Sequence, residues 1–125
     1  MDRLFVSLGG LFGAAGVIGG ALGAHVFEAR LDADALAVYQ TAVLYCLLHA
    51  MMLVVSGLRL RQFPASRALR LAGAAFGVGI VLFSGSLLLK ALWGPGWWSG
   101  LAPKGGSAFI AGWLLIALSG WLDTR

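Results

Sequence analysis

The sequence predicts an all-α fold: a four-helix transmembrane bundle with glycine-rich helix packing, forming a single integral membrane domain over residues 1–125. Hydrophobic residues make up 60% of the chain and charged residues 11%, whereas a soluble domain carries about 25% charged residues. The mean hydropathy is +0.91. The apolar runs are continuous, which favours helices over the alternating strands of a barrel.

Four apolar runs are long enough for a helix to cross a hydrocarbon core about 30 Å thick. Their approximate spans are 4–27, 34–58, 66–92 and 106–122. The first run has the positive start and the small residues near Ala24 that are typical of a cleaved signal peptide. Its apolar stretch is longer than the core of a signal peptide, so we expect it to remain as a membrane helix.

Residues between the runs predict where the helices begin and end. Asp32 suits the N-cap of the second helix. Pro64 suits the first position of the third helix, and Gly94-Pro95-Gly96 is expected to end it. Lys104-Gly105-Gly106 is expected to form a tight turn into the fourth helix, because the full pattern of a phosphate-binding loop is absent.

Lys and Arg residues in the short loops predict the orientation. If the N-terminus is cytoplasmic, the inner side carries Arg3, Arg59, Arg61, Arg67, Arg70 and Arg125. The outer side then carries Arg30, Lys90 and Lys104. This excess predicts that both termini are cytoplasmic. Because orientation accounts for the basic residues, no nucleic-acid partner is expected.

Glycines of the first span recur at steps of four and three residues. The stripe comprises Gly9, Gly13, Gly16, Gly20 and Gly23, and a shorter pair is Gly73 and Gly77. Small residues let helices approach closely in lipid. The stripe therefore indicates either packing within the bundle or a self-association face. The expected partners are membrane lipid and either a second copy of the chain or another membrane protein.

Polar side chains inside the spans form a candidate cluster in the outer half of the bilayer. Thr41, Tyr45 and His49 lie on one face of the second helix because they are four residues apart. The whole cluster comprises His25, Gln40, Thr41, Tyr45, His49, Ser84 and Ser86. Such residues either satisfy one another's hydrogen bonds or line a polar path.

Catalytic and metal chemistry has little support in the sequence. No acidic residue lies inside a span, so a Ser-His-Asp arrangement is not expected. The chain has one cysteine, Cys46, and two histidines, which without a carboxylate at ligand spacing make a weak metal site. We therefore expect no catalytic residue, no metal and no cofactor.

Four blocks in this order resemble a known family of small membrane proteins: GALGAH (20–25), TAVLYCLLHA (41–50), LFSGS (82–86) and PKGGSAFIAGW (103–113). This is the domain-of-unknown-function 423 family, with its YgdD-like and YwdK-like bacterial proteins and transmembrane protein 256 relatives. The resemblance implies a multipass protein of the bacterial inner membrane and no agreed activity. The matching positions are Gly20, Gly23, His25, Thr41, Tyr45, His49, Ser84, Gly85, Ser86, Gly105, Gly106 and Trp113. Cys46 and Leu88 depart from the pattern, where we expect glutamine and tyrosine.

Three hypotheses about function follow. The first is a non-enzymatic scaffold or accessory protein that acts through helix–helix contacts. The second is a small channel or carrier with a polar path lined by His25, Gln40, Tyr45, His49 and Ser84. The third, and least supported, is an enzyme acting on lipid at the outer interface near His25, Tyr39 and Lys90, since no acid–base pair has convincing spacing.

Overall fold

The computed structural model describes residues 1–124, and Arg125, one of the expected cytoplasmic charges, lies outside the described residues. Four helices are long and apolar enough to cross a membrane, and residues 1–124 contain no strand. The all-α, four-helix prediction is confirmed. In chain order the elements are α1 (Asp2–His25), η1 (Phe27–Ala29), α2 (Ala33–Gln62), α3 (Arg67–Gly79), η2 (Ile80–Ser84), α4 (Gly85–Trp93), η3 (Trp97–Gly100) and α5 (Leu101–Leu122).

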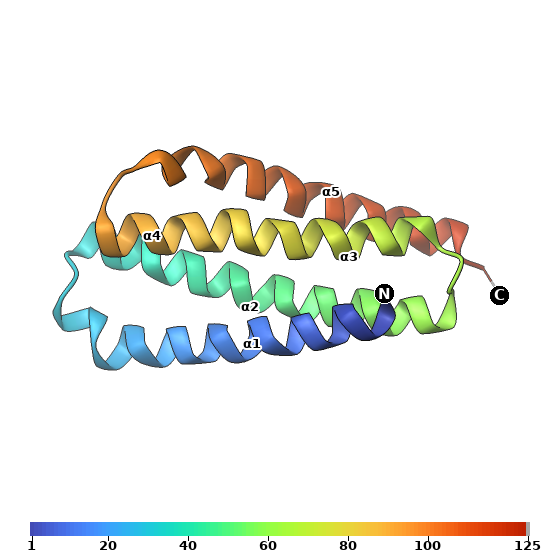
Figure 1. Cartoon of the computed structure of the whole chain (residues 1–125), viewed down its shortest axis with the longest axis horizontal. Coiled ribbons are helices and arrows are strands. Elements are labelled where there is room, and N and C mark those ends of the chain that lie inside the picture. The colour runs from blue at the N-terminus through green and yellow to red at the C-terminus, as the bar shows by residue number, and fades with distance from the viewer. Residues whose placement is uncertain (125) are drawn as a thin grey trace.

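The third crossing is one rod made of α3, η2 and α4 (Figure 1). Its middle, Ile80–Ser84, is a π-helical turn. This turn could not be predicted from the sequence, because one extra residue per helical turn does not change the residue pattern of a run that is apolar on all sides. π-helical turns inside α-helices are found mostly at functional sites.

Two predicted boundaries are wrong. Pro64 does not begin the third helix: it lies in the preceding turn, and Ser66 is the N-cap, with its hydroxyl accepting from the Leu69 N–H at 3.2 Å. Lys104-Gly105-Gly106 is not a turn but part of α5, which begins at Leu101 rather than near 106. Pro103 is compatible with this start because N–H groups in the first turn have no partner within the helix.

Two other boundaries agree with expectation. The Asp32 carboxylate accepts from the Ala35 N–H at 2.8 Å and caps α2. Gly94 ends α4 with φ of 81°, a backbone conformation that side chains rarely adopt. The second helix continues to Gln62, past the predicted end at 58, so Arg59 and Arg61 form its last turn.

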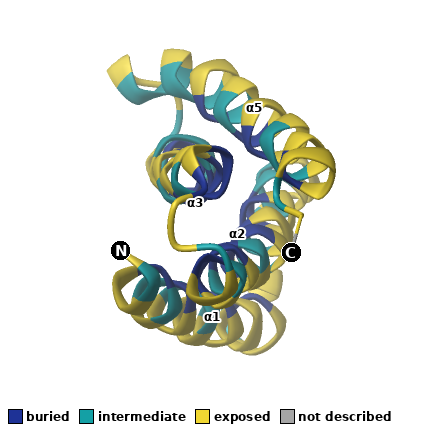
Figure 2. Cartoon of the chain, turned by 90° about the vertical axis from the view of Figure 1, so that its right-hand side faces the viewer, coloured by how far each residue is buried: buried dark blue, intermediate teal, exposed yellow. Residues whose placement is uncertain are grey.

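The helices run antiparallel in sequence order, so both ends of the chain and the α2–α3 connection lie at one end of the bundle (Figure 1). Viewed along the bundle, α1 packs on α2, α3 lies between α2 and α5, and α5 is on the side opposite α1 (Figure 2). Two hydrogen bonds between side chains connect distant segments at the end of the bundle that holds both termini. Arg61 Nε donates to Asp2 Oδ2 at 3.1 Å, and Ser66 Oγ donates to Asp123 Oδ2 at 2.6 Å.

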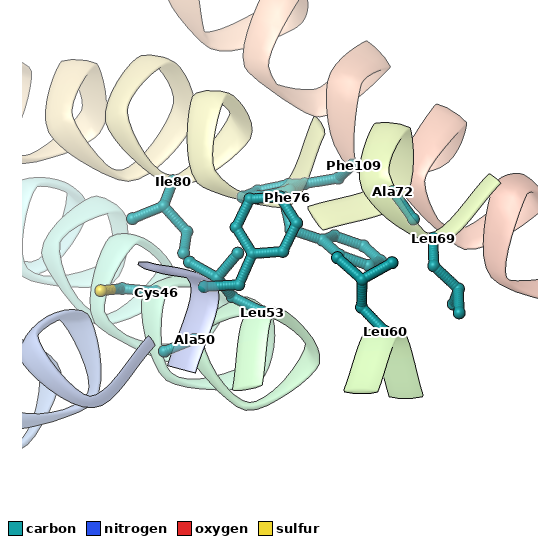
Figure 3. Close-up of a cluster of buried hydrophobic side chains, with 10 residues drawn as sticks. Cys46, Ala50, Leu53, Leu60, Leu69, Ala72, Phe76, Ile80 and Phe109 are labelled. Atoms are coloured by element: carbon teal, nitrogen blue, oxygen red, sulfur yellow. The ribbon is translucent and has the colours of Figure 1, made fainter. Parts of the chain in front are cut away.

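The core lies mainly where α2 meets the third crossing. Ten buried side chains form it: Phe5, Cys46, Ala50, Leu53, Leu60, Leu69, Ala72, Phe76, Ile80 and Phe109 (Figure 3). Only 17% of the apolar stretch of α1 and 22% of that of the last crossing are buried, against 39% for each of the two central crossings. The two outer helices therefore leave most of their surface to lipid or to a partner.

The glycine stripe of α1 divides into two sets. Gly9, Gly16 and Gly23 are buried against α2, and an added Cβ at Gly9 lies 2.8 Å from the Ala50 carbonyl oxygen. Gly13 has nothing within 4 Å of an added Cβ, and Gly20 is exposed. The pair on α3 divides in the same way, because Gly73 packs against Phe5 whereas Gly77 faces open space.

Candidate functional site: an aromatic groove between α2 and α5

His49 lies midway along α2 and is buried, with 3% of its surface exposed. Its Nδ1 is 2.8 Å from the Tyr45 carbonyl oxygen, and its Nε2 is 3.1 Å from Nε1 of Trp113 on α5. A carbonyl only accepts and an indole N–H only donates. The ring is therefore neutral, with its proton on Nδ1, and both nitrogens are occupied.

Aromatic side chains from two facing helices, Tyr45 on α2 and Phe109 and Trp113 on α5, surround this histidine. Tyr45 and His49 are one turn apart on α2, and Phe109 and Trp113 are one turn apart on α5, so each pair lies on one helix face. The His49 and Phe109 rings are nearly parallel, with centroids 3.6 Å apart and planes at 10°. Tyr45 stacks on the next turn, 5.7 Å from the His49 ring.

The π-helical turn η2 completes the site. The Phe83 ring lies 4.9 Å from Tyr45 and 5.5 Å from Phe109. Ser84 points the other way, into the core, and its hydroxyl donates to the Ala42 carbonyl at 2.8 Å. Gly105 permits the close approach of α5, because an added Cβ would lie 2.4 Å from the Phe83 nitrogen.

These side chains line a groove of about 550 Å³ that we call the aromatic groove. Its lining is Tyr45, Leu48, His49, Phe83, Pro103, Gly106, Ser107, Phe109, Ile110 and Trp113, which includes no charged residue. Its polar groups are the two His49 nitrogens, the Trp113 N–H and the hydroxyls of Tyr45 and Ser107. The Ser107 hydroxyl donates to the Pro103 carbonyl at 2.9 Å.

Tyr45 supplies the one polar side-chain group of the groove that makes no hydrogen bond within residues 1–124. Its carbonyl is used by His49, but no described atom accepts from or donates to its hydroxyl. The side chain is 37% exposed. A helix rises 1.5 Å per residue, so Tyr45 lies about 18 Å along α2 from Ala33. Because the 30 residues of α2 span about 45 Å, this depth is within a hydrocarbon core of about 30 Å.

The other members of the predicted cluster lie elsewhere. His25 is exposed at the end of α1. Gln40 is exposed beside a separate groove of about 340 Å³ between α1 and α2, which also includes Tyr39 and Glu28. Tyr39, which the enzyme hypothesis placed at the outer interface with His25 and Lys90, donates its hydroxyl to the Gly19 carbonyl and joins the two helices.

Thr41 and Ser86 satisfy their hydroxyls on their own helices. Thr41 donates to the Ala37 carbonyl at 3.0 Å and is exposed, whereas Ser86 donates to the Phe83 carbonyl at 3.0 Å and is buried. The structure thus brings together Tyr45 and His49, with Ser84 behind the groove wall, and separates the rest.

Sequence reasoning missed the aromatic half of the site. Phe83, Phe109 and Trp113 were not in the candidate polar cluster, although all three lie in the family blocks and Trp113 is one of the matching positions, because single aromatic residues in apolar runs do not stand out. The i, i+4 spacing of Phe109 and Trp113, equal to that of Tyr45 and His49, is the signal that could have found them. Within residues 1–124 no three His, Cys, Asp or Glu side chains are grouped to hold a metal ion.

Four apolar crossings joined by short loops define the class: a multipass α-helical membrane protein. Residues 19–106 match the model of the family described as "Protein of unknown function (DUF423)", and the chain belongs to this family. The predicted family is confirmed. No solved structure matches the chain.

Relatives align along most of the chain. The UPF0382 membrane protein SH2409 of Staphylococcus haemolyticus is 36% identical over 117 residues, 94% of each chain. The UPF0382 membrane protein YwdK of Bacillus subtilis is 32% identical over 117 residues, 94% of this chain and 95% of that protein. The UPF0382 inner membrane protein YgdD of Escherichia coli is 36% identical over 98 residues, 78% of this chain and 73% of that protein. Neither the family description nor these names indicate a catalytic activity.

Proposed function

We propose that this protein is a non-enzymatic scaffold or accessory protein of the bacterial inner membrane, which acts through helix–helix contacts. The observation that carries the proposal is the openness of α1. This helix packs along α2, only 17% of its apolar stretch is buried, and its outer face is exposed along its whole length (Figure 2).

The exposed surface of α1 carries small residues beside larger apolar ones such as Leu11, Val17 and Ile18. Gly10, Ala14, Gly20, Ala21 and Ala24 are all exposed. In lipid, where no hydrophobic force drives helices together, such residues allow the close backbone contact on which helix association depends. We propose that this face binds α1 of a second copy of the chain, and that the resulting oligomer is the scaffold.

The interior supports a structural rather than a catalytic role. Every buried side-chain nitrogen or oxygen within residues 1–124 has a hydrogen-bond partner. Both His49 nitrogens are occupied, so the ring is not free to act as a general base. The channel or carrier hypothesis has less support, because its five residues lie on different surfaces: His25 and Gln40 near α1, Tyr45 and His49 at the aromatic groove, and Ser84 in the core.

We further propose that both termini are cytoplasmic. The end of the bundle that holds the termini carries Arg3, Arg59, Arg61, Arg67 and Arg70, and the opposite end carries Arg30, Lys90 and Lys104. Positive residues are retained on the cytoplasmic side of a membrane. The name of the Escherichia coli relative, an inner membrane protein, supports the location in the inner membrane.

Cysteine crosslinking in native membranes tests the scaffold proposal. In a Cys46→Ser background, Ala14→Cys places one thiol midway along the exposed face of α1. Ala111→Cys is the matched control, because Ala111 is exposed at a similar depth on α5. We expect oxidation to give a product of twice the chain mass for Ala14→Cys alone. Monomer only, or equal crosslinking at both positions, contradicts the proposal.

A further inference from the structure

We propose that the aromatic groove binds a neutral, lipid-soluble compound with a flat conjugated ring and a ring carbonyl oxygen, the chemistry of an isoprenoid quinone. The groove is lined by residues of α2, η2 and α5 and by none of α1, so this proposal does not rest on self-association. Three properties of the groove select this chemistry.

The first property is that the groove has an uncharged lining although it lies within the hydrocarbon core. No charged side chain lines the groove, and Tyr45 lies inside the hydrocarbon core by the length of α2. An ion at this depth needs a charged or strongly polar partner, which the lining does not supply. The occupant is therefore uncharged, and it reaches the groove from the bilayer because the groove is open at the lipid-facing surface between α2 and α5.

The second property is a single hydrogen-bond donor that has no partner among residues 1–124. The Ser107 hydroxyl, the Trp113 N–H and both His49 nitrogens already have partners. The Tyr45 hydroxyl has none among residues 1–124, and a polar group without a partner in an apolar medium is costly. An oxygen acceptor on the occupant removes this cost, and a ring carbonyl presents such an oxygen in the plane of a flat ring.

The third property is the shape of the wall. Four rings form it: Tyr45, Phe83, Phe109 and Trp113. Aromatic rings prefer offset-stacked or edge-to-face contacts with another ring, and a volume of about 550 Å³ falls within the usual range of small-molecule sites. The wall is held in place from behind, because Trp113 is bonded to His49 and Ser84 is bonded to Ala42.

Two other occupants of the groove would make different contacts. A phospholipid acyl chain fills the groove with apolar surface but leaves the Tyr45 hydroxyl without a partner. A second copy of the chain seated on this face would join α5 helices rather than α1 helices. The experiment below separates both from the proposed ligand.

Fluorescence of Trp113 reports directly on the groove, because its indole is part of the wall and quinones quench indole emission. The full chain is placed in lipid nanodiscs with Trp93, Trp97, Trp98 and Trp121 replaced by Phe, and is titrated with a short-chain benzoquinone. We expect saturable quenching. Tyr45→Phe, which removes only the hydroxyl, is expected to weaken binding about tenfold, the effect of losing one hydrogen bond.

Tyr39→Phe is the matched control, since it removes the hydroxyl of the only other tyrosine, which bonds Gly19 between α1 and α2. It is expected to leave the quinone affinity unchanged. Quenching that rises linearly without saturation, or that is the same in the Tyr45→Phe protein, shows partition into lipid alone and overturns the proposal. Crosslinking between Ile110→Cys positions in a Cys46→Ser background that the quinone does not affect also overturns it, because Ile110 lines the groove and is 64% exposed, and the groove is then an interface between copies.

The infrared band of the bound quinone carbonyl gives a second readout, which does not depend on the affinity. A hydrogen bond from Tyr45 lowers the carbonyl stretching frequency relative to free quinone in the same nanodiscs. We expect this shift in the parent protein and in the Tyr39→Phe protein, and its loss in the Tyr45→Phe protein. An identical band in all three contradicts the assignment of Tyr45, whatever the outcome of crosslinking on α1.

Discussion

The indole N–H of Trp113 donates to Nε2 of His49 across 3.1 Å and joins α5 to α2 in the middle of the bundle. Beside this bond the Phe109 ring lies almost parallel to the imidazole. The deepest polar group of α2 is thus used to hold α5 in place. This use explains how a histidine can stay inside a membrane without a carboxylate beside it, because a neutral ring with both nitrogens bonded carries no unmet polar group.

Replacing Trp113 with Phe tests this bond. The change keeps an aromatic ring but leaves Nε2 of His49 without a donor, so we expect a loss of about 1–2 kcal/mol in the free energy of unfolding. The free energy of unfolding is measured in mixed micelles that contain increasing concentrations of a denaturing detergent. Trp121→Phe is the control, because Trp121 is 85% exposed. Equal stability of the two variants argues against a structural bond.

A pair of glycine variants on α1 separates internal packing from the exposed face. An added methyl group at Gly9 meets the Ala50 carbonyl oxygen at 2.8 Å, so Gly9→Ala forces α1 away from α2, at a cost of roughly 1–3 kcal/mol. Gly13→Ala meets nothing within 4 Å, and its stability is expected to stay within about 1 kcal/mol of the parent chain. The same unfolding assay checks both, and a reversed order contradicts the packing.

Gly105 sets the distance between α5 and the π-helical turn η2. An added Cβ lies 2.4 Å from the Phe83 backbone nitrogen, which cannot move aside as a flexible side chain can. We expect Gly105→Ala to lower stability and to weaken quenching of Trp113 by quinone. In the neighbouring Gly106→Ala protein the added Cβ is 3.8 Å from the Phe83 ring, an ordinary contact, so the stability is expected to match the parent.

Solute flux distinguishes the scaffold from a channel or carrier. The polar residues that were expected to line a path lie on separate surfaces, and His49 has no free nitrogen. We therefore expect liposomes that contain the protein to pass protons, ions and small solutes no faster than empty vesicles. Flux above that level that His49→Ala abolishes would restore the channel or carrier hypothesis.

Accessibility labelling tests the orientation. In a Cys46→Ser background, Arg61→Cys and Lys104→Cys place a thiol at opposite ends of the bundle (Figure 1). A membrane-impermeant maleimide added to intact spheroplasts is expected to label position 104 and to leave position 61 unlabelled until the cells are opened. Labelling of both positions from one side contradicts a four-crossing arrangement.

The sequence alone determined the class of the protein. The length of an apolar run and its lack of charge are local properties that can be read from the sequence. The thickness of the hydrocarbon core sets the length that a spanning helix needs, so the all-α fold with four crossings could be predicted directly. The cap at Asp32 and the helix end at Gly94 could also be predicted, because each depends on a few neighbouring residues. The family could be recognised because its four blocks recur in order.

Only the tertiary structure decided which helix faces meet. A membrane helix is apolar on every side, so its pattern does not mark an inner face as an amphipathic helix does. Gly9 and Gly13 are equivalent in the sequence, yet one packs on a carbonyl and the other faces open space. Likewise, Tyr45 and His49 were visible as polar residues, but the rings of Phe83, Phe109 and Trp113 became part of their site only when α5 and η2 packed against α2, since packing is set by contacts between distant segments rather than by local pattern.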